Sequence, residues 1–204
     1  MEGILQPNTV STRRVHPHKF ALWLAMGSIA MMFAGLTSAY IVRQSQGNWR
    51  MFHLPIVFWI STAVILISSV TVHLGVRAFK QRQMLRYRAL ITTTLALGLL
   101  FGILQSVGFW QLYHVPQETI LEGQKLVETI RVSGNPSESF LFIITGLHLA
   151  HILGGIIALL LVFLMAYRRR VKVYNATGLE IVAAYWHFVD VLWLYLFIFF
   201  LANQ

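Results

Sequence analysis

The chain has 204 residues, of which 57% are hydrophobic and only 11% are charged, and this composition excludes an ordinary water-soluble globule. Its 16 Lys and Arg residues outnumber its 7 Asp and Glu residues and give a net charge of +9, but they lie in polar segments between apolar stretches, which argues against a nucleic-acid-binding protein. The chain contains no cysteine, which excludes disulfides, thiolate metal sites and cysteine nucleophiles.

The first apolar stretch follows a polar tail, residues 1–19, which lacks the short apolar core and cleavage site of a signal peptide. A spanning helix needs about 20 mainly apolar residues. Five stretches meet this requirement, at residues 20–42, 55–78, 89–112, 140–167 and 183–202. The sequence therefore predicts an all-α, polytopic membrane protein in which residues 20–204 form a single bundle of five transmembrane helices behind a cytoplasmic tail.

The polar segments between these stretches differ in positive charge. On the side of the N-terminus, three Lys and Arg residues precede the first helix, five lie between the second and third, and four follow the fourth. The opposite side carries only four in all. Because positive loops stay in the cytoplasm, this asymmetry predicts an N-terminus inside and a C-terminus outside.

The longest connection, residues 113–139, is predicted to be a solvated outer loop with a surface helix around residues 119–130. Its four glutamates are scattered along the loop, which favours a solvated segment over a patch for a cationic partner. The sequence Asn135-Pro136-Ser137-Glu138 predicts the start of the fourth helix, because Asn caps a helix, Pro suits its first position and Glu completes a capping box.

Ionisable residues within the fourth and fifth stretches need an explanation, because each costs a few kcal/mol in a membrane unless it is paired or hydrated. His148 and His151 lie three residues apart and share a helix face, and so do His187 and Asp190. Glu180 lies seven residues before His187 on the same stripe. These five residues are the candidate site.

Three interpretations of the candidate site remain open from spacing alone. A metal or heme site is one, because histidines and a carboxylate on facing helices satisfy a ligand count. A structural cluster is another, in which the groups hydrogen-bond across an interface that Gly146, Gly154 and Gly155 allow to close. A proton relay is the third, although no path across the whole bilayer is evident.

Two motifs around these residues resemble cytochrome c oxidase subunit III. The first matches the family pattern Ser-Phe followed by Thr-Gly-x-His-x-x-His-x-x-x-Gly, and it contains Ser139, Phe140, Thr145, Gly146, His148, His151 and, less strictly spaced, Gly154. The second is Tyr185-Trp186-His187-Phe188-Val189-Asp190-Val191-Leu192-Trp193. It differs from the family's Tyr-Trp-His-Phe-Val-Asp-Val-Val-Trp only at Leu192. The resemblance extends more loosely to residues 31–35 and to Gln105, and five helices match the short bacterial form of the family.

The sequence departs from this family at two positions. Ile29 and Gly108 stand where the family pattern or many relatives carry a glutamate. These losses weaken any claim that the chain relays protons through its own interior, and they argue against carrying over a carboxylate role from the family.

The resemblance implies a non-redox subunit III of a heme-copper terminal oxidase in the bacterial inner membrane, which supports the subunit that reduces dioxygen to water with proton translocation. The implied partners are oxidase subunits I and II and membrane lipids, with no nucleic acid, in a hetero-oligomeric complex that can join a respiratory supercomplex. The resemblance implies heme and copper in subunit I. For this chain it implies bound phospholipid and no metal. The electron donor, cytochrome c or quinol, stays open.

For the candidate site, the resemblance implies an internal polar cluster of His148, His151, His187, Asp190 and Glu180, with no catalytic residue. The family-motif residues are Gln105, Thr145, Gly146, Trp186 and Trp193. Two other classes remain as alternatives. One is a membrane-anchored cytochrome b in which two of the three histidines ligate heme, and the other is a small transporter, which would need a hydrated central path.

Overall fold

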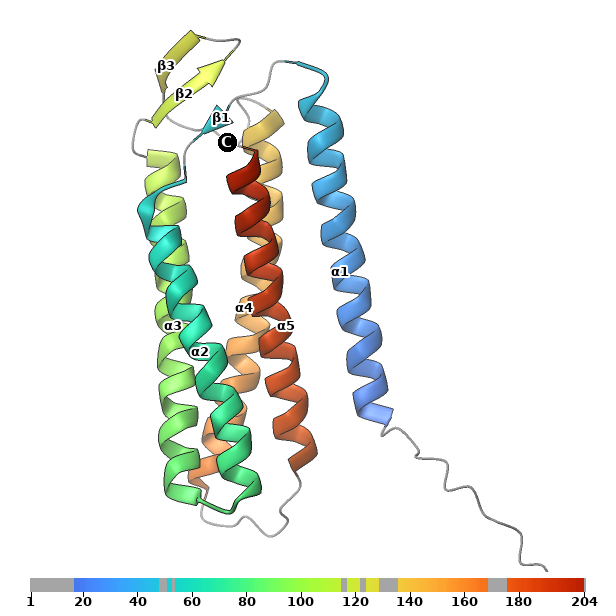
Figure 1. The fold of residues 1–204 in the computed structure, drawn as a ribbon, viewed down its shortest axis with the longest axis vertical. Coiled ribbons are helices and arrows are strands. Elements are labelled where there is room, and N and C mark those ends of the chain that lie inside the picture. Colours follow the sequence, from blue (N-terminus) through green and yellow to red (C-terminus); the bar gives the residue numbers. More distant parts are fainter. Residues whose placement is uncertain are drawn as a thin grey trace, which may run out of the picture.

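The computed structural model describes residues 17–47, 51–52, 54–114, 117–121, 124–128, 136–168 and 176–203. Five long helices make up most of it (Figure 1). They are α1 (Pro17–Gln44), α2 (Ile56–Lys80), α3 (Met84–His114), α4 (Pro136–Tyr167) and α5 (Ala176–Ala202). All five are long and apolar enough to cross a membrane, which confirms the predicted all-α bundle of five membrane helices.

The helices extend beyond most of the predicted apolar stretches. The start of α4 at Pro136 confirms the predicted helix start, while Asn135 lies outside the described residues. The start of α1 at Pro17 makes the last three residues of the predicted tail helical. Polar helix ends reach the headgroup region, where water satisfies their side chains, so hydropathy alone underestimates helix length.

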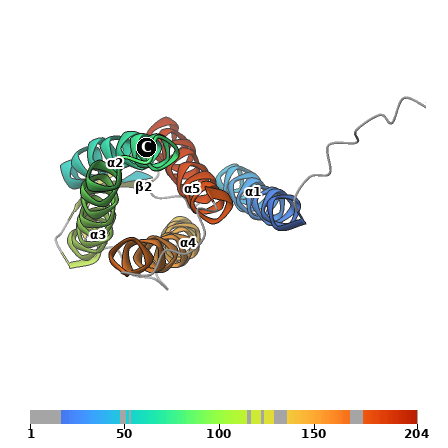
Figure 2. The same ribbon diagram turned by 90° about the horizontal axis from the view of Figure 1, so that it is seen from below.

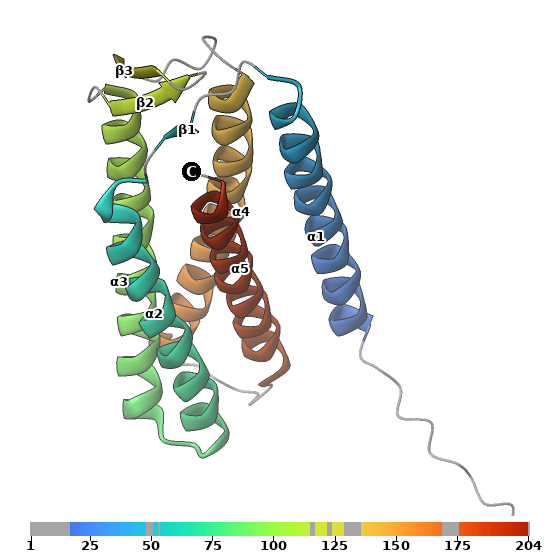
Figure 3. The same cartoon turned by 45° about the horizontal axis from the view of Figure 1, so that its top comes forward.

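The predicted surface helix around residues 119–130 is wrong. The described residues of this connection form an antiparallel hairpin of β2 (Gln117–Leu121) and β3 (Gln124–Glu128), and β1 (Met51–Phe52) pairs with β2. The register pairs Thr119 with Leu126 and Met51 with Ile120. Two short runs with β-branched residues, separated in the sequence by two residues that include a glycine, favour a hairpin over a helix. Figure 3 shows the small sheet at the end of the bundle where α3 ends and α4 begins.

Four of the helices form a ring. Going around it, α2 packs against α3, α3 against α4, α4 against α5, and α5 against α2. Helix α1 lies outside this ring, where it contacts α4 and α5 (Figure 2). Its outward face carries large apolar side chains such as Trp23 and Met31, which are 67% and 78% exposed. Such a surface suits lipid or another apolar helix rather than water.

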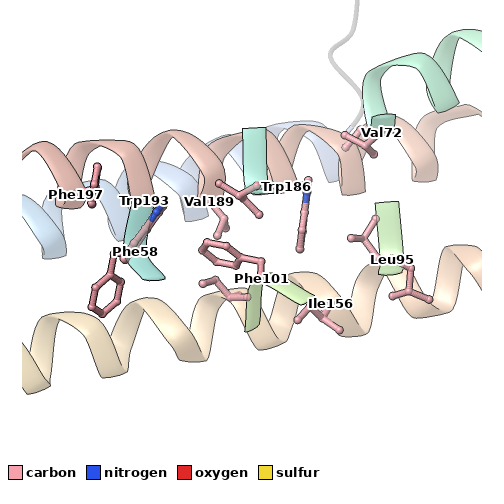
Figure 4. Packing of buried hydrophobic residues seen from close by; sticks show 13 residues of the cluster. Phe58, Val72, Leu95, Phe101, Ile156, Trp186, Val189, Trp193 and Phe197 are labelled. Carbon is pink, nitrogen blue, oxygen red and sulfur yellow. The ribbon is translucent and has the colours of Figure 1, made fainter. Parts of the chain in front are cut away.

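The ring is centred on the indole of Trp186, which is 1% exposed. Figure 4 shows Trp186, Val189, Trp193 and Phe197 pointing from α5 into the interior. Glycines flank the indole on two other helices: a Cβ built on Gly98 of α3 or on Gly155 of α4 would lie 2.9 Å from it. The ring therefore closes around Trp186 only because these two positions lack a side chain.

Candidate functional site

The two tryptophans of the family motif in α5 fix that helix against α2. Trp186 donates its indole N–H to the Ser68 hydroxyl at 3.1 Å, and Trp193 donates to the Thr62 hydroxyl at 3.0 Å. Both indoles are buried, and a buried indole N–H needs an acceptor. Because the bonds are seven residues apart on α5 and six apart on α2, they fix both the rotation and the register of the two helices.

His148 of α4 lies in an aromatic enclosure. Its ring stacks on Trp193, with centroids 5.2 Å apart and an interplanar angle of 22°, and meets the edge of Phe33 from α1 at 6.3 Å. The side chain is 2% exposed, and neither ring nitrogen has a hydrogen-bond partner among the described residues. His148 therefore contacts α5 and α1 through ring packing.

Asp190 of α5 is also buried, at 2% exposure. Within the part of the chain that the structure describes, neither carboxyl oxygen has a hydrogen-bond partner. A charged side chain at the centre of a membrane helix costs about 2.5–3.5 kcal/mol. Because no ion pair with Asp190 is found among the described residues, the carboxyl group is expected to be a neutral acid.

His187, one turn before Asp190, faces α2. Its Nδ1 lies 2.6 Å from the Ser69 hydroxyl, and its ring centroid lies 6.2 Å from that of His73. His151 of α4 faces α1 instead: its Nδ1 donates to the Leu147 carbonyl at 2.7 Å, and its ring meets the edge of Phe33. His151 and His187 therefore point toward different neighbouring helices.

Glu180 lies apart from these groups, near the start of α5. One carboxylate oxygen accepts from Lys19 of α1 at 2.6 Å, and the other contacts Lys80 of α2 at 2.7 Å. The glutamate side chain is 27% exposed and the lysines are 41% and 54% exposed. These two ion pairs join α1 and α2 to α5.

Of the five predicted site residues, none is hydrogen-bonded to another in the described chain. Three of the partners that do contact them, Ser69, His73 and Lys80, lie on α2, and sequence reasoning missed them. A signal was present, because hydroxyl residues recur at seven-residue intervals on α2. The residues that recur in this way are Ser61 with Ser68 and Thr62 with Ser69.

The remaining family-motif residues have structural surroundings. Gln105 is buried and donates to the Ser61 hydroxyl at 3.0 Å. Thr145 donates to the Leu141 carbonyl of its own helix. Gly146 lies on the surface, where an added Cβ would meet nothing within 4 Å.

Gly108, where many members of the family carry a glutamate, faces the ring of Phe58. A Cβ there would lie 3.0 Å from this ring, and Phe58 is 1% exposed. Phenylalanine at position 58 therefore fills the space that a side chain at position 108 would need.

The candidate ligands for metal or heme lie apart from one another. Among the described residues, no three His, Asp or Glu side chains lie together as a possible metal site. His148 stacks on an indole and His187 is bonded to Ser69, so these two rings do not face each other across a common space. The geometry gives no support to the metal or bis-histidine heme interpretations of the sequence.

Comparison with known proteins gives a consistent answer. The family model for cytochrome c oxidase subunit III matches residues 48–202. A probable cytochrome c oxidase subunit 3 of Nocardia farcinica is 30% identical, over 94% of this chain and 93% of its own. A cytochrome c oxidase subunit 3 of Corynebacterium diphtheriae is 31% identical over 82% and 79%. A probable quinol oxidase subunit 3 of Staphylococcus aureus is 30% identical over 93% and 92%.

The matched region contains α2, α3, α4 and α5, with both motif tryptophans and the groups around them. The resemblance that the sequence motifs indicated is thereby confirmed. The chain belongs to the cytochrome c oxidase subunit III family.

Proposed function

We propose that this chain is the non-redox third subunit of a heme-copper terminal oxidase, which stabilises the catalytic subunit while that subunit reduces dioxygen to water with proton translocation. The observation that carries the proposal is the match to third subunits along more than nine-tenths of both chains in two relatives. In this assignment the heme and copper belong to subunit I, and this chain supplies a rigid membrane scaffold.

The packing supports a scaffold role. The ring of α2 to α5 closes around Trp186, and hydrogen bonds from both motif tryptophans hold α5 on α2. Helix α1 is attached to the ring by Lys19 with Glu180 and by a 2.7 Å hydrogen bond between Thr37 and Tyr195. Such a unit can present fixed apolar surfaces to subunits I and II, because its own polar contacts are satisfied mainly inside the chain.

Lipid binding is part of the same proposal. A groove of about 600 Å³ lies between α3 and α4. Its lining is almost wholly apolar and consists of Leu99, Gly102, Ile103, Ser106, Val107, Trp110, Leu149, Leu153 and Ile156. Gly102 leaves space in its floor, and Trp110 lies near the end of α3, where indoles suit the membrane interface. A phospholipid acyl chain fits this chemistry.

The proposed setting is the bacterial plasma membrane, with the N-terminus in the cytoplasm. Glu180 contacts both Lys19 and Lys80, so the start of α1, the end of α2 and the start of α5 lie together at one end of the bundle. That end also carries Arg77 in the last turn of α2 and Arg82 in the turn between α2 and α3. A basic end of this kind favours the cytoplasmic side.

The scaffold role is tested by replacing Asp190 with alanine in the tagged chain and purifying the oxidase. The substitution opens a cavity in the packed interior between α5 and α2, so we expect less of this chain in the purified complex at unchanged heme content. The matched control is Val191→Ala, on the neighbouring residue, which is 64% exposed. Equal retention of the two variants would contradict a structural role for Asp190.

A further inference from the structure

His73 is an exposed histidine within the membrane-spanning part of α2. Its ring centroid lies 6.2 Å from that of His187 on α5, but no hydrogen bond to His73 is found among the described residues. A neutral imidazole always carries one N–H donor, and a charged imidazole carries two. His73 therefore has a donor for which the described chain supplies no acceptor.

Two exposed hydroxyl groups on α3 show how a polar side chain can avoid this situation. Thr93 donates to the Ala89 carbonyl at 3.0 Å, and Ser106 donates to the Gly102 carbonyl at 2.9 Å. In both cases the acceptor lies one turn earlier on the same helix. His73 makes no such bond to its own helix in the described chain.

The depth of His73 places its ring in the apolar layer. Helix α2 has 25 residues and is about 37 Å long, whereas the hydrocarbon core is about 30 Å thick. His73 lies seven residues before Lys80, the last residue of α2, or about 10 Å along the axis. A histidine side chain is too short to reach the headgroups from there, as Lys and Arg side chains can.

Lipid tails offer no acceptor to an imidazole N–H at this depth. For this reason histidines in membrane helices almost always face the interior of a bundle or a water-filled cavity. His73 faces outward from the bundle of this chain. Its position indicates that this side of the chain lies inside a larger bundle, which a second membrane protein completes.

His73 belongs to a regular surface, which we call the α2–α5 face. On α2, Trp59, Leu66 and His73 follow one another at intervals of seven residues, and Trp59 and Leu66 are 54% and 43% exposed. On α5, Val191 and Ile198 are seven residues apart and are 64% and 62% exposed. Side chains repeat at this interval where one helix packs lengthwise on another. The face is therefore an apolar stripe with a polar position at His73.

Contacts between the two helices hold the α2–α5 face in place. The rings of Trp59 and Phe197 meet edge to face, with centroids 4.9 Å apart. Ser69 bonds to Nδ1 of His187 at 2.6 Å. Figure 2 shows α2, α5 and α1 following one another along one side of the molecule. A preformed face loses little conformational freedom when a partner packs on it.

We propose that the α2–α5 face packs against a transmembrane helix of another subunit of the oxidase, and that a hydrogen-bond acceptor on that helix binds the imidazole of His73. The partner helix is apolar where it meets Trp59 and Leu66, and it carries a carboxyl or amide oxygen at the level of His73. This inference rests on the proposed function, because it requires a partner subunit, and it assigns the contact surface and its polar anchor.

Photo-crosslinking in native membranes tests the surface. A photoreactive phenylalanine analogue is placed at position 66 or 191 of the tagged chain, and at position 103 as the control, because Ile103 is 61% exposed on α3 and lines the apolar groove. We expect positions 66 and 191 to crosslink to another membrane subunit of the co-purifying oxidase, and position 103 to crosslink to lipid. Adducts with lipid alone, or with a second copy of this chain, at positions 66 and 191 would overturn the proposal.

Substitution of His73 tests the anchor. An interhelical hydrogen bond in a membrane changes an association constant by about threefold to thirtyfold. His73→Leu should weaken retention of this chain in the detergent-purified oxidase by that factor, and His73→Gln, which restores a donor, should recover most of it. The matched control is Thr93→Leu, because Thr93 is exposed but bonded to its own helix.

The unfolding midpoint of the isolated chain separates a lost contact from a lost fold. His73 is exposed, so His73→Leu should leave this midpoint unchanged. Wild-type retention of His73→Leu, or an equal loss in Thr93→Leu, would overturn the proposal. Absence of any oxidase partner from the wild-type preparation would instead refute the proposed function.

Discussion

The contact between Trp186 and its two glycines makes a quantitative prediction about the ring. A Cβ on Gly98 would lie 2.9 and 3.0 Å from two atoms of the indole, whereas a Cβ on Gly102, one turn later on α3, would lie 3.7 Å from Ile156. The first distance demands displacement of a rigid, fully buried ring, and the second is an ordinary contact. Both changes to alanine gain the same helix propensity, about 1 kcal/mol, which cancels when the two variants are compared.

The difference between Gly98→Ala and Gly102→Ala should therefore equal the cost of overpacking, about 1–3 kcal/mol. For a chain of this size each kcal/mol corresponds to about 2–4 °C in the unfolding midpoint. We expect Gly98→Ala to melt below Gly102→Ala by this amount in thermal unfolding of the purified chain in mild detergent. Gly155→Ala should behave like Gly98→Ala, because its Cβ would also lie 2.9 Å from the indole. Equal midpoints for Gly98→Ala and Gly102→Ala would refute the view that the ring closes on Trp186.

Two further predictions concern the polar contacts of α5. Glu180→Gln removes two partly exposed ion pairs, with Lys19 and Lys80, and should lower the free energy of unfolding by about 0.2–1 kcal/mol at low salt. The difference in unfolding midpoint from the wild type should vanish at high salt, because the charges are screened. A loss of stability that does not depend on salt would show that the contact is not ionic. Trp193→Phe removes the hydrogen bond to Thr62 while keeping an aromatic ring, and should cost about 0.5–1.5 kcal/mol. Thr62→Val should then lower the free energy of unfolding by less in the Trp193→Phe variant than in the wild type. Equal losses in the two backgrounds would mean that the two side chains do not interact.

The sequence was sufficient to predict the five helices, because a membrane requires long apolar stretches and each stretch was unmistakable. It was also sufficient for the start of α4, where capping chemistry is local. It failed at the hairpin of β2 and β3, where the short polar segment of mixed propensity predicts a surface helix instead. There the pairing of β1 with β2, from a distant part of the chain, supports the strands.

The candidate site was predicted only in part, because residue spacing places side chains on one helix face but does not choose their partners. Glu180 and His187 share a stripe on α5, yet a separation of seven residues puts about 10 Å between them, and Glu180 pairs with lysines at the bundle end. His148 meets an indole rather than Asp190. The recurrence of hydroxyl residues on α2 indicates a polar face of that helix, but it does not say that Ser69 is the one that meets His187.

The most direct test of the central claim is to express the tagged chain in its native host, purify it in mild detergent, and record the optical spectrum and the identities of the co-purifying proteins. A third subunit should bring with it an oxidase that contains heme and copper, and dissociation should leave the isolated chain without heme. Heme retained by the isolated chain, with no oxidase partner, would contradict the account and make the protein a cytochrome.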